Sequence, residues 1–350
     1  MFDALLWRWV PLAAALLLNG CSTLDYYSHL AGGQLHLLQA REPIAELLEN
    51  PTADPELKQR LALAQQARDF ASAQLSLPDN DSYRLYADIQ RPFVVWNVFA
   101  TPEFSLSPEL HCFPIAGCVA YRGFYSQGRA RGAAALLKQQ GLDTYLGGVE
   151  AYSTLGWFDD PILNTMLRWS DERLVAVIFH ELAHQQLYVA NDTAFNESFA
   201  SFVEREGLSQ WRIKQGLPPN DPQGEQQREQ FIALVLASRT RLQQLYASDL
   251  PPAQMRSGKQ AEIARLRAEY HALSKREWGG NGRYDDWINA PINNAKLLPF
   301  GLYDQWVPAF AALFEQVERD WPRFYQRVAA LGELPERERH QALMDLSAGS

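Results

Sequence analysis

The stretch Val175-Ala-Val-Ile-Phe-His-Glu-Leu-Ala-His-Gln-Gln-Leu-Tyr188 contains a His-Glu-x-x-His pattern, at His180, Glu181 and His184, inside an apolar run of helical character. Residues four positions apart lie on one face of an α-helix, with Cβ atoms roughly 5–6 Å apart, so both imidazoles can reach one Zn²⁺ ion at about 2.0–2.1 Å. Glu181 points toward the same side and can accept a proton from the water molecule that the metal activates. The pattern therefore predicts the centre of a metallohydrolase.

The residues around the pattern specify the helix that carries it. Ser170 is the predicted N-cap, and Asp171 and Glu172 place negative charge in the first turn, where the helix dipole stabilises it. Apolar side chains on most sides predict a core helix: Leu174, Val175, Val177, Ile178, Leu182 and Leu187. Two histidines and a glutamate buried there without partners would cost several kcal/mol, which a metal ion would offset. The alternative is a pair of hydrogen-bonded core histidines beside a glutamate that is present by chance.

A third ligand is expected on the next helix. Twelve residues separate His184 from Glu197, a break is predicted at Asn191, and residues 194–206 predict a second helix. A returning helix brings Glu197 over the two histidines and completes a His₂Glu set, which leaves one zinc position open for water. Glu204 lies two turns further along the same face. It is the alternative ligand, or a partner that orients a ligand.

The His-Glu-x-x-His pattern followed by Asn196-Glu-Ser-Phe-Ala200 resembles the gluzincin metallopeptidases. In that group a helix-borne Glu completes the zinc site and the Glu of the motif is the general base, so the resemblance implies these roles for Glu197 and Glu181. The whole chain also resembles a family of bacterial lipoproteins described as zinc aminopeptidases. Besides the N-terminus and the zinc motifs, that resemblance is carried by Gly-Cys-Val-Ala-Tyr-Arg-Gly (117–123), Gly-Gly-Val-Glu-Ala-Tyr (147–152) and Gly-Trp-Phe-Asp-Asp-Pro (156–161).

A predicted strand over residues 144–154 precedes the zinc helix and contains Gly147, Gly148 and Glu150. In gluzincins an edge strand here lines the cleft and pairs with the extended substrate backbone. In their aminopeptidases a Gly-x-Met-Glu-Asn stretch there offers its Glu to the free amine of the substrate. The similar Gly-Gly-Val-Glu-Ala, which lacks the Met and the Asn, implies that Glu150 binds a substrate amine. The alternative is a glutamate at a strand end that faces water.

The composition indicates a globular protein. Of its 350 residues, 47% are hydrophobic and 21% are charged, and a chain of this length predicts two lobes around a cleft. The net charge is −9 and no basic cluster is present, so no nucleic-acid binding is expected.

The N-terminus reads as a targeting segment. Residues 10–18 form an apolar run after Arg8 that is too short to cross a bilayer, as in a signal peptide. The following Leu18-Asn-Gly-Cys21 resembles a lipobox, which implies that Cys21 becomes an acylated N-terminus. Ser22 at the next position resembles sorting to the outer membrane, on the side that faces the periplasm. The alternative is an ordinary signal peptide with an incidental cysteine.

The two remaining cysteines, Cys112 and Cys118, have five residues between them. In an oxidising compartment such a pair most simply forms a disulfide. The alternative is a cysteine-based metal site that includes His111.

The predicted fold class is α+β and predominantly helical. A small mixed β-sheet unit is followed by a zinc-binding helix pair and a helical second lobe, an arrangement that resembles gluzincins. The expected organisation is a signal peptide (1–20), an N-terminal helical segment (21–90), a catalytic α+β unit (91–207) and a C-terminal helical lobe (208–350). Residues 226–246 and 252–276 predict two long helices that form a hairpin.

Zinc peptidases of this type use a Tyr or a His to hydrogen-bond the tetrahedral oxyanion. Tyr303 is the predicted donor, with Tyr284 and His271 as alternatives. Tyr121 and Arg122 are expected to border the cleft. The aromatic side chains of the 156–161 segment, Trp157 and Phe158, are expected to pack in the interior.

These features together predict a zinc-dependent peptidase, an aminopeptidase acting on peptides in the periplasm and tethered to the membrane by a lipid at Cys21. Three alternatives remain open: an endopeptidase acting on envelope proteins, an amidase acting on cell-wall peptides, and a non-catalytic envelope lipoprotein with a structural zinc.

Overall fold

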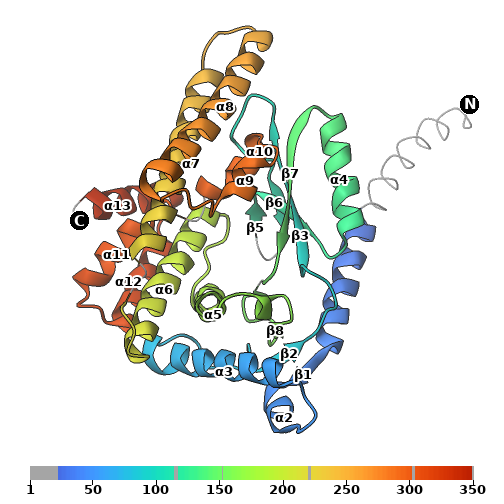
Figure 1. The fold of residues 1–350 in the computed structure, drawn as a ribbon, viewed down its shortest axis with the longest axis vertical. Helices are drawn as coiled ribbons and strands as arrows, with labels where there is room; N and C mark the ends of the chain where they lie inside the picture. Colours follow the sequence, from blue (N-terminus) through green and yellow to red (C-terminus); the bar gives the residue numbers. More distant parts are fainter. Residues whose placement is uncertain (1–22, 114–116, 152, 220–221, 302–303, 349–350) are drawn as a thin grey trace, which may run out of the picture.

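The computed structural model describes residues 23–113, 117–151, 153–219, 222–301 and 304–348 (Figure 1). The predicted signal peptide, the predicted lipidation site Cys21 and the predicted oxyanion donor Tyr303 lie outside the described residues. Most described residues are helical and the strands are short, which confirms the predominantly helical α+β prediction. Within these ranges, no helix combines the length and the apolar character that crossing a bilayer requires.

A first helix covers residues 23–39. The later helices are α2 (Ile44–Glu49), α3 (Pro55–Leu75), α4 (Gln127–Gln139), α5 (Asp171–Gln186), α6 (Thr193–Lys214), α7 (Pro222–Tyr246), α8 (Pro252–Glu277), α9 (Asp285–Asn289), α10 (Asn294–Leu297), α11 (Val307–Gln316), α12 (Trp321–Glu333) and α13 (Glu336–Ala348), with short 3₁₀ turns at Met166–Arg168 and Leu298–Gly301. The strands are β1 (Arg41–Pro43), β2 (Leu85–Ala87), β3 (Val95–Pro102), β4 (His111–Phe113), β5 (Gly117–Val119), β6 (Tyr121–Phe124), β7 (Leu142–Val149) and β8 (Ile162–Leu163).

Helix α5, the predicted zinc helix, lies at the centre of the fold between α3 and α6 (Figure 1). Ser170 caps it as predicted, since its Oγ accepts a hydrogen bond from the Arg173 N–H. Phe179 is fully buried against α3 and α6. The neighbouring helix approaches closely at Gly207, where a Cβ atom would lie 2.9 Å from the Phe179 ring. The close contact holds α5 and α6 in a fixed relation.

One large core joins distant parts of the chain. It draws buried side chains from α3, α5 and α6 and also from α11, α12 and α13, and runs from Leu37 to Leu343 in the sequence. A second cluster lies between α7 and α8, which project from the rest of the molecule as the predicted hairpin (Figure 1). The predicted domain boundaries stay a prediction, but the last three helices pack on the same core as the zinc helix.

The largest sheet has the antiparallel order β6-β3-β7. Trp96 and Val98 of β3 face the cluster that includes Ala130 and Ala134 of α4. Because successive side chains on a strand point to opposite faces, Val95 and Asn97 lie on the other side of the sheet. That second face is free of α4, and it points toward α5.

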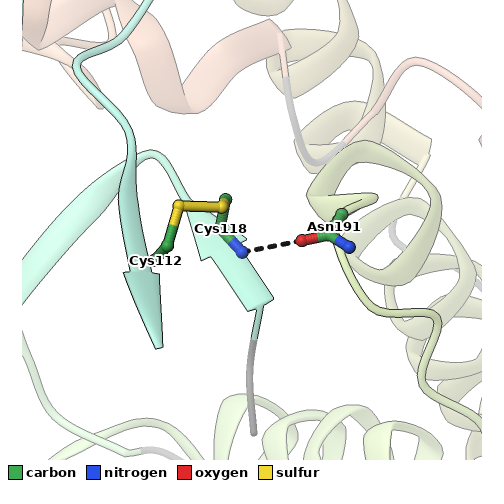
Figure 2. Close-up of a disulfide and its surroundings, with 3 residues drawn as sticks. All are labelled: Cys112, Cys118 and Asn191. Carbon is green, nitrogen blue, oxygen red and sulfur yellow. Dashed lines mark hydrogen bonds between the residues drawn. A yellow bond between two sulfur atoms is a disulfide. The ribbon is translucent and has the colours of Figure 1, made fainter. Parts of the chain in front are cut away.

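The predicted disulfide is present: Cys112 and Cys118 are bonded across the β4–β5 hairpin (Figure 2). The alternative metal site with His111 is therefore wrong, because bonded sulfurs offer no thiolate. The Cys118 N–H donates a hydrogen bond of 2.9 Å to Oδ1 of Asn191, in the loop that joins α5 to α6. The cross-linked hairpin is thus held against the turn between the two helices that carry the predicted ligands.

A loop before α5 is tied down by Asp160, whose side chain is only 3% exposed. Its Oδ2 accepts a 2.8 Å hydrogen bond from the Thr154 N–H, and its backbone carbonyl accepts one of 2.6 Å from the Tyr83 N–H. Burial raises the pKa of Asp160 to about 7, against the hydrogen bonds from Thr154 and Ser153 that lower it. The folded protein therefore keeps this carboxyl protonated at pH values where the unfolded chain has released the proton.

The raised pKa predicts a specific pH dependence of stability. The ordinary pKa of an aspartate is 3.8, so the contribution of Asp160 to the free energy of unfolding is largest at about pH 4 and below. This contribution is lost as the pH rises to about 7. Asp160→Asn keeps an acceptor for the Thr154 N–H and carries no charge. The free energy of unfolding, measured with urea, should fall by a few kcal/mol more in the wild type than in the variant between pH 4 and pH 8. The reason is that one pKa unit corresponds to about 1.4 kcal/mol. A difference between the two proteins that is independent of pH would contradict this assignment.

Candidate metal centre and active site

Three side chains from two helices meet at one point. His180 and His184 lie on α5, and Glu197 lies on α6. The two Nε2 atoms are 3.2 Å apart, and Oε2 of Glu197 is 3.4 Å from Nε2 of His180 and 3.6 Å from Nε2 of His184. A point equidistant from three atoms at these separations lies about 2.0 Å from each, which is the distance of a zinc ion from imidazole nitrogen. The predicted set of ligands is therefore brought together.

Glu204 lies on the opposite side of the first imidazole. Its Oε2 is 2.9 Å from Nδ1 of His180, at hydrogen-bond distance. An Nδ1–H that donates to this carboxylate leaves a lone pair on Nε2, which faces Glu197. Of the two roles considered for Glu204, the geometry favours the partner that orients a ligand. Nδ1 of His184 is buried and makes no hydrogen bond within the part of the chain that the structure describes, so no partner at that nitrogen orients the ring.

The charges of this cluster fit a cation at its centre. Burial lowers the pKa of His180, but the hydrogen bonds to Glu197 and Glu204 outweigh that effect and raise it. Burial likewise raises the pKa of Glu197, but the charge of His184 and hydrogen bonds from both histidines bring it down to about 2. Facing electron-pair donors repel one another unless a positive charge lies between them. The residues present therefore fit a metal ion, and two histidines with one glutamate are an established set for catalytic zinc.

The position of Glu197 depends on the residue before it. Oδ1 of Asn196 accepts a 2.8 Å hydrogen bond from the Val189 N–H, and Nδ2 of Asn196 donates one of 2.7 Å to the Val189 carbonyl. Asp192 caps α6 through the Phe195 N–H at 3.0 Å. These bonds close the turn between the two helices and bring Glu197 back over the histidines. Sequence reasoning missed the role of Asn196, although the Asn-Glu pair was part of the recognised motif.

Glu181 is buried beside the two histidines and lines the same cavity. Burial raises the pKa of Glu181, whereas the positive charge of His180 and His184 opposes the rise. A carboxyl group with a raised pKa is a stronger base than an exposed carboxylate, so it can accept a proton and later return it. This environment fits the predicted general base.

A cavity of about 820 Å³ opens over the three converging side chains. Its walls come from four parts of the chain: the first helix with Tyr26, Tyr27, Leu30, Ala31 and Gln34, the sheet with Val95, Asn97, Tyr121 and Gly123, the loop with Ser153, Thr154, Leu155, Trp157 and Phe158, and the α5–α6 pair. The expectation that Trp157 and Phe158 pack in the interior was wrong, since they are 67% and 45% exposed and line the cavity. The bonds of Asp160 hold their loop outward.

Two phenol groups share the cavity with the metal cluster. Tyr121 lines it as expected, and burial together with the negative charge of Glu197 raises its pKa. Arg122 is not among the described cavity residues, because its guanidinium stacks on the Tyr26 ring at 3.8 Å. Tyr188 follows the end of α5 and also lines the cavity, and burial and Glu197 raise its pKa in the same way. By contrast, the alternative donor Tyr284 stacks on Phe231 in the second core cluster, with ring centroids 4.0 Å apart, away from the cavity. Tyr188 was overlooked, although it lies four positions after His184.

The predicted amine-binding residue has another partner. Oε2 of Glu150 accepts a 2.7 Å hydrogen bond from the Trp169 indole N–H, and its carbonyl accepts one of 2.5 Å from the Thr165 hydroxyl. Glu150 is not among the described residues that line the cavity, whereas Val149 and Ala151 on either side of it are. Strand β7 ends at Val149. The alternation of side-chain directions along a strand therefore does not apply to Glu150. This placement does not support a contact with a substrate amine.

The two glycines predicted with Glu150 differ from each other in position. Gly148 backs onto Phe93, where an added Cβ would lie 2.5 Å from the ring. Gly147 pairs with Asn97, which is one of the cavity residues.

The bond between His180 and Glu204 predicts a graded loss of metal affinity. Glu204→Ala removes the acceptor that fixes the ring, and losses of this kind typically cost about 10- to 100-fold in metal affinity. Zinc dissociation constants, measured by competition with a chelator, should rise by that factor. Glu206→Ala is the matched control, because this residue is on the same helix but pairs with Gln210 and Arg319. Equal affinities in the two variants would show that Glu204 does not orient the ligand.

Comparison with known proteins identifies one family. The model of one protein family, described as "Putative aminopeptidase", matches residues 25–343. No curated protein and no solved structure matches the chain. The matched region contains the first helix, the sheet and both helices of the metal cluster, and the description of the family indicates a peptidase-like function. Since the match spans most of the sequence, the chain belongs to this aminopeptidase family.

Proposed function

We propose that this protein is a zinc-dependent peptidase that acts as an aminopeptidase. The observation that carries the proposal is the convergence of Nε2 of His180, Nε2 of His184 and Oε2 of Glu197 beside the buried carboxyl of Glu181, at the wall of a large cavity. The description of the family supports the peptidase class. His₂Glu ligation with an adjacent glutamate is the arrangement by which zinc peptidases hydrolyse amide bonds.

His180, His184 and Glu197 would hold the zinc ion, which would supply polarisation of the scissile carbonyl and a lowered pKa of the attacking water. Glu181 accepts the proton of that water as the new C–O bond forms, and donates it to the leaving amine as the C–N bond breaks. Tyr121 donates its hydroxyl hydrogen to the oxyanion, with Tyr188 as the second candidate, because both lie in the cavity near Glu197. Glu204 keeps the His180 ring in the orientation that presents Nε2.

We also propose that the protein is an outer-membrane lipoprotein, anchored at Cys21 and facing the periplasm. The lipobox-like Leu18-Asn-Gly-Cys21 supports the anchor. The disulfide between Cys112 and Cys118 supports an oxidising compartment, where such bonds persist.

An endopeptidase is the second candidate, and a specific observation favours it. An aminopeptidase needs a carboxylate for the ammonium group of its substrate. Among the described residues of the cavity wall, the carboxylates are those of Glu181 and Glu197, both already assigned to the metal centre, and Glu150 is engaged with Trp169.

The general-base role predicts a separation of metal binding from catalysis. Glu181→Gln should retain zinc, because it leaves all three ligands in place, while kcat for peptide hydrolysis falls by about 10²- to 10⁴-fold. Metal content by mass spectrometry and peptide turnover by chromatography measure the two properties. His184→Ala is the control that should lose both zinc and activity. Full activity of the Glu181 variant would refute the proposed mechanism.

The choice between the two peptidase types predicts opposite responses to blocking the substrate. An aminopeptidase should lose essentially all turnover when the N-terminus of a peptide is acetylated, since the ammonium group can then no longer bind. An endopeptidase should cleave free and acetylated peptides at similar rates. Mass spectrometry of the products identifies the bond that is cut. The endopeptidase would be excluded if only the first residue were released, and only from peptides with a free N-terminus.

A further inference from the structure

The sheet forms a floor of the cavity on which one polar side chain stands among apolar neighbours. Asn97 of β3 lies opposite Gly123 of β6 and Gly147 of β7 in the register of the sheet. Gly123 has no side chain and lines the cavity, so nothing from β6 covers the amide group of Asn97. At Gly147 the Tyr145 ring lies 3.4 Å from the position that a Cβ atom would take. At Gly123 an added Cβ would come within 3.3 Å of Oδ1 of Asn97. Gly123 thus keeps the floor accessible on one side of this amide.

The Asn97 amide makes no hydrogen bond to any residue within the described ranges, and its side chain is half-buried and reaches the cavity. An asparagine amide carries two donors and an acceptor. A donor of the amide can bond to the C=O of a peptide group, and its acceptor can bond to the N–H. Leaving them without partners once a substrate has excluded water would cost free energy, so a substrate that fits must supply both.

Away from the metal, most of the cavity wall is apolar and aromatic, and its other polar side chains, Gln34, Ser153 and Thr154, are uncharged. Its rings and aliphatic side chains are Tyr26, Tyr27, Leu30, Phe113, Tyr125, Leu155, Trp157 and Phe158. The described residues of this wall include no lysine, arginine or aspartate, and its glutamates belong to the metal centre. Burying a charged side chain of a substrate there would leave it unpaired, whereas a large apolar side chain gains about 25 cal/mol for each Å² removed from water.

We propose that Asn97 binds the backbone of the substrate next to the scissile bond, and that the flanking substrate side chains are large and apolar. The substrate class is therefore a peptide segment with neutral aromatic or aliphatic residues around the cleavage site. This inference deepens the proposed function and rests on it. Trp157 and Phe158 contribute the exposed rim of the subsite, and Gly123 gives the substrate backbone access to the floor.

Binding is tested in zinc-loaded Glu181→Gln protein, in which turnover is blocked. The probes are neutral hexapeptides with two central Phe or Leu residues and the same peptides with central Glu or Lys. Each probe has a free and an acetylated N-terminus, so that recognition of the chain end does not decide the result. Fluorescence anisotropy of labelled peptides gives the dissociation constants. The apolar peptides should bind at least tenfold more tightly than the charged ones, and equal affinities would overturn the substrate class.

The role of Asn97 is tested by Asn97→Ala and Asn97→Asp in the same protein. Loss of one neutral hydrogen bond should weaken binding of the apolar peptides about 2- to 12-fold, since each contributes roughly 0.5–1.5 kcal/mol. Asn289→Ala is the matched control, because Asn289 is exposed on α9 and lines no part of the cavity. Unchanged affinity in both Asn97 variants would overturn its role. If Asn97→Ala does not fold, Asn97→Asp and the peptide comparison still decide.

Hydrolysis by the wild-type protein separates this inference from the proposed function. If the zinc-loaded wild type cleaves none of these peptides, the peptidase proposal fails, whatever the binding results are. If it cleaves apolar and charged peptides equally well, the protein is a peptidase and only the substrate class is wrong.

Discussion

The hydrogen bonds between the Asn196 amide and the backbone of Val189 are the contact on which the functional centre depends. They close the turn between α5 and α6, and so decide that Glu197 returns to the histidines of the preceding helix. The Asp192 cap strengthens the same turn and links it to α13 through Arg339 at 2.8 Å. The disulfide hairpin adds a contact from the other side through Asn191. A metal centre built on two helices is only as well ordered as the turn between them.

Around this centre, the chain divides its chemistry between two regions. Carboxylates and imidazoles are gathered on α5 and α6, where His180 pairs with Glu197 and Glu204 and His184 pairs with Glu197. The opposite walls are apolar and come from the first helix, the sheet and the loop that Asp160 holds. Carboxylates attract a metal cation, and an apolar surface favours burial of apolar substrate side chains. The division therefore places a candidate hydrolytic centre beside a region suited to uncharged substrate groups.

The metal ligands and the helices could be predicted because their signals are local. Four-residue spacing and helical periodicity indicated His180 and His184, and an N-cap with acidic residues marked the start of α5. The disulfide followed from the count and spacing of two cysteines. Glu150 and Trp157 could not be placed in this way, because each lies just outside a regular element. There the direction of a side chain depends on tertiary partners. Glu150 is held by Trp169, and the loop that carries Trp157 is held by the hydrogen bond between Asp160 and Thr154.

The sequence by itself determined the predominantly helical α+β class, the candidate ligands and the turn between their helices, because these follow from interactions within a few residues of chain. Only the tertiary structure decided which carboxylate faces Nε2 and which faces Nδ1 of His180, since Glu197 and Glu204 lie on the same face of one helix. It also decided which side chains line the cavity. Those come from segments more than a hundred residues apart, and their meeting depends on the packing of the whole core.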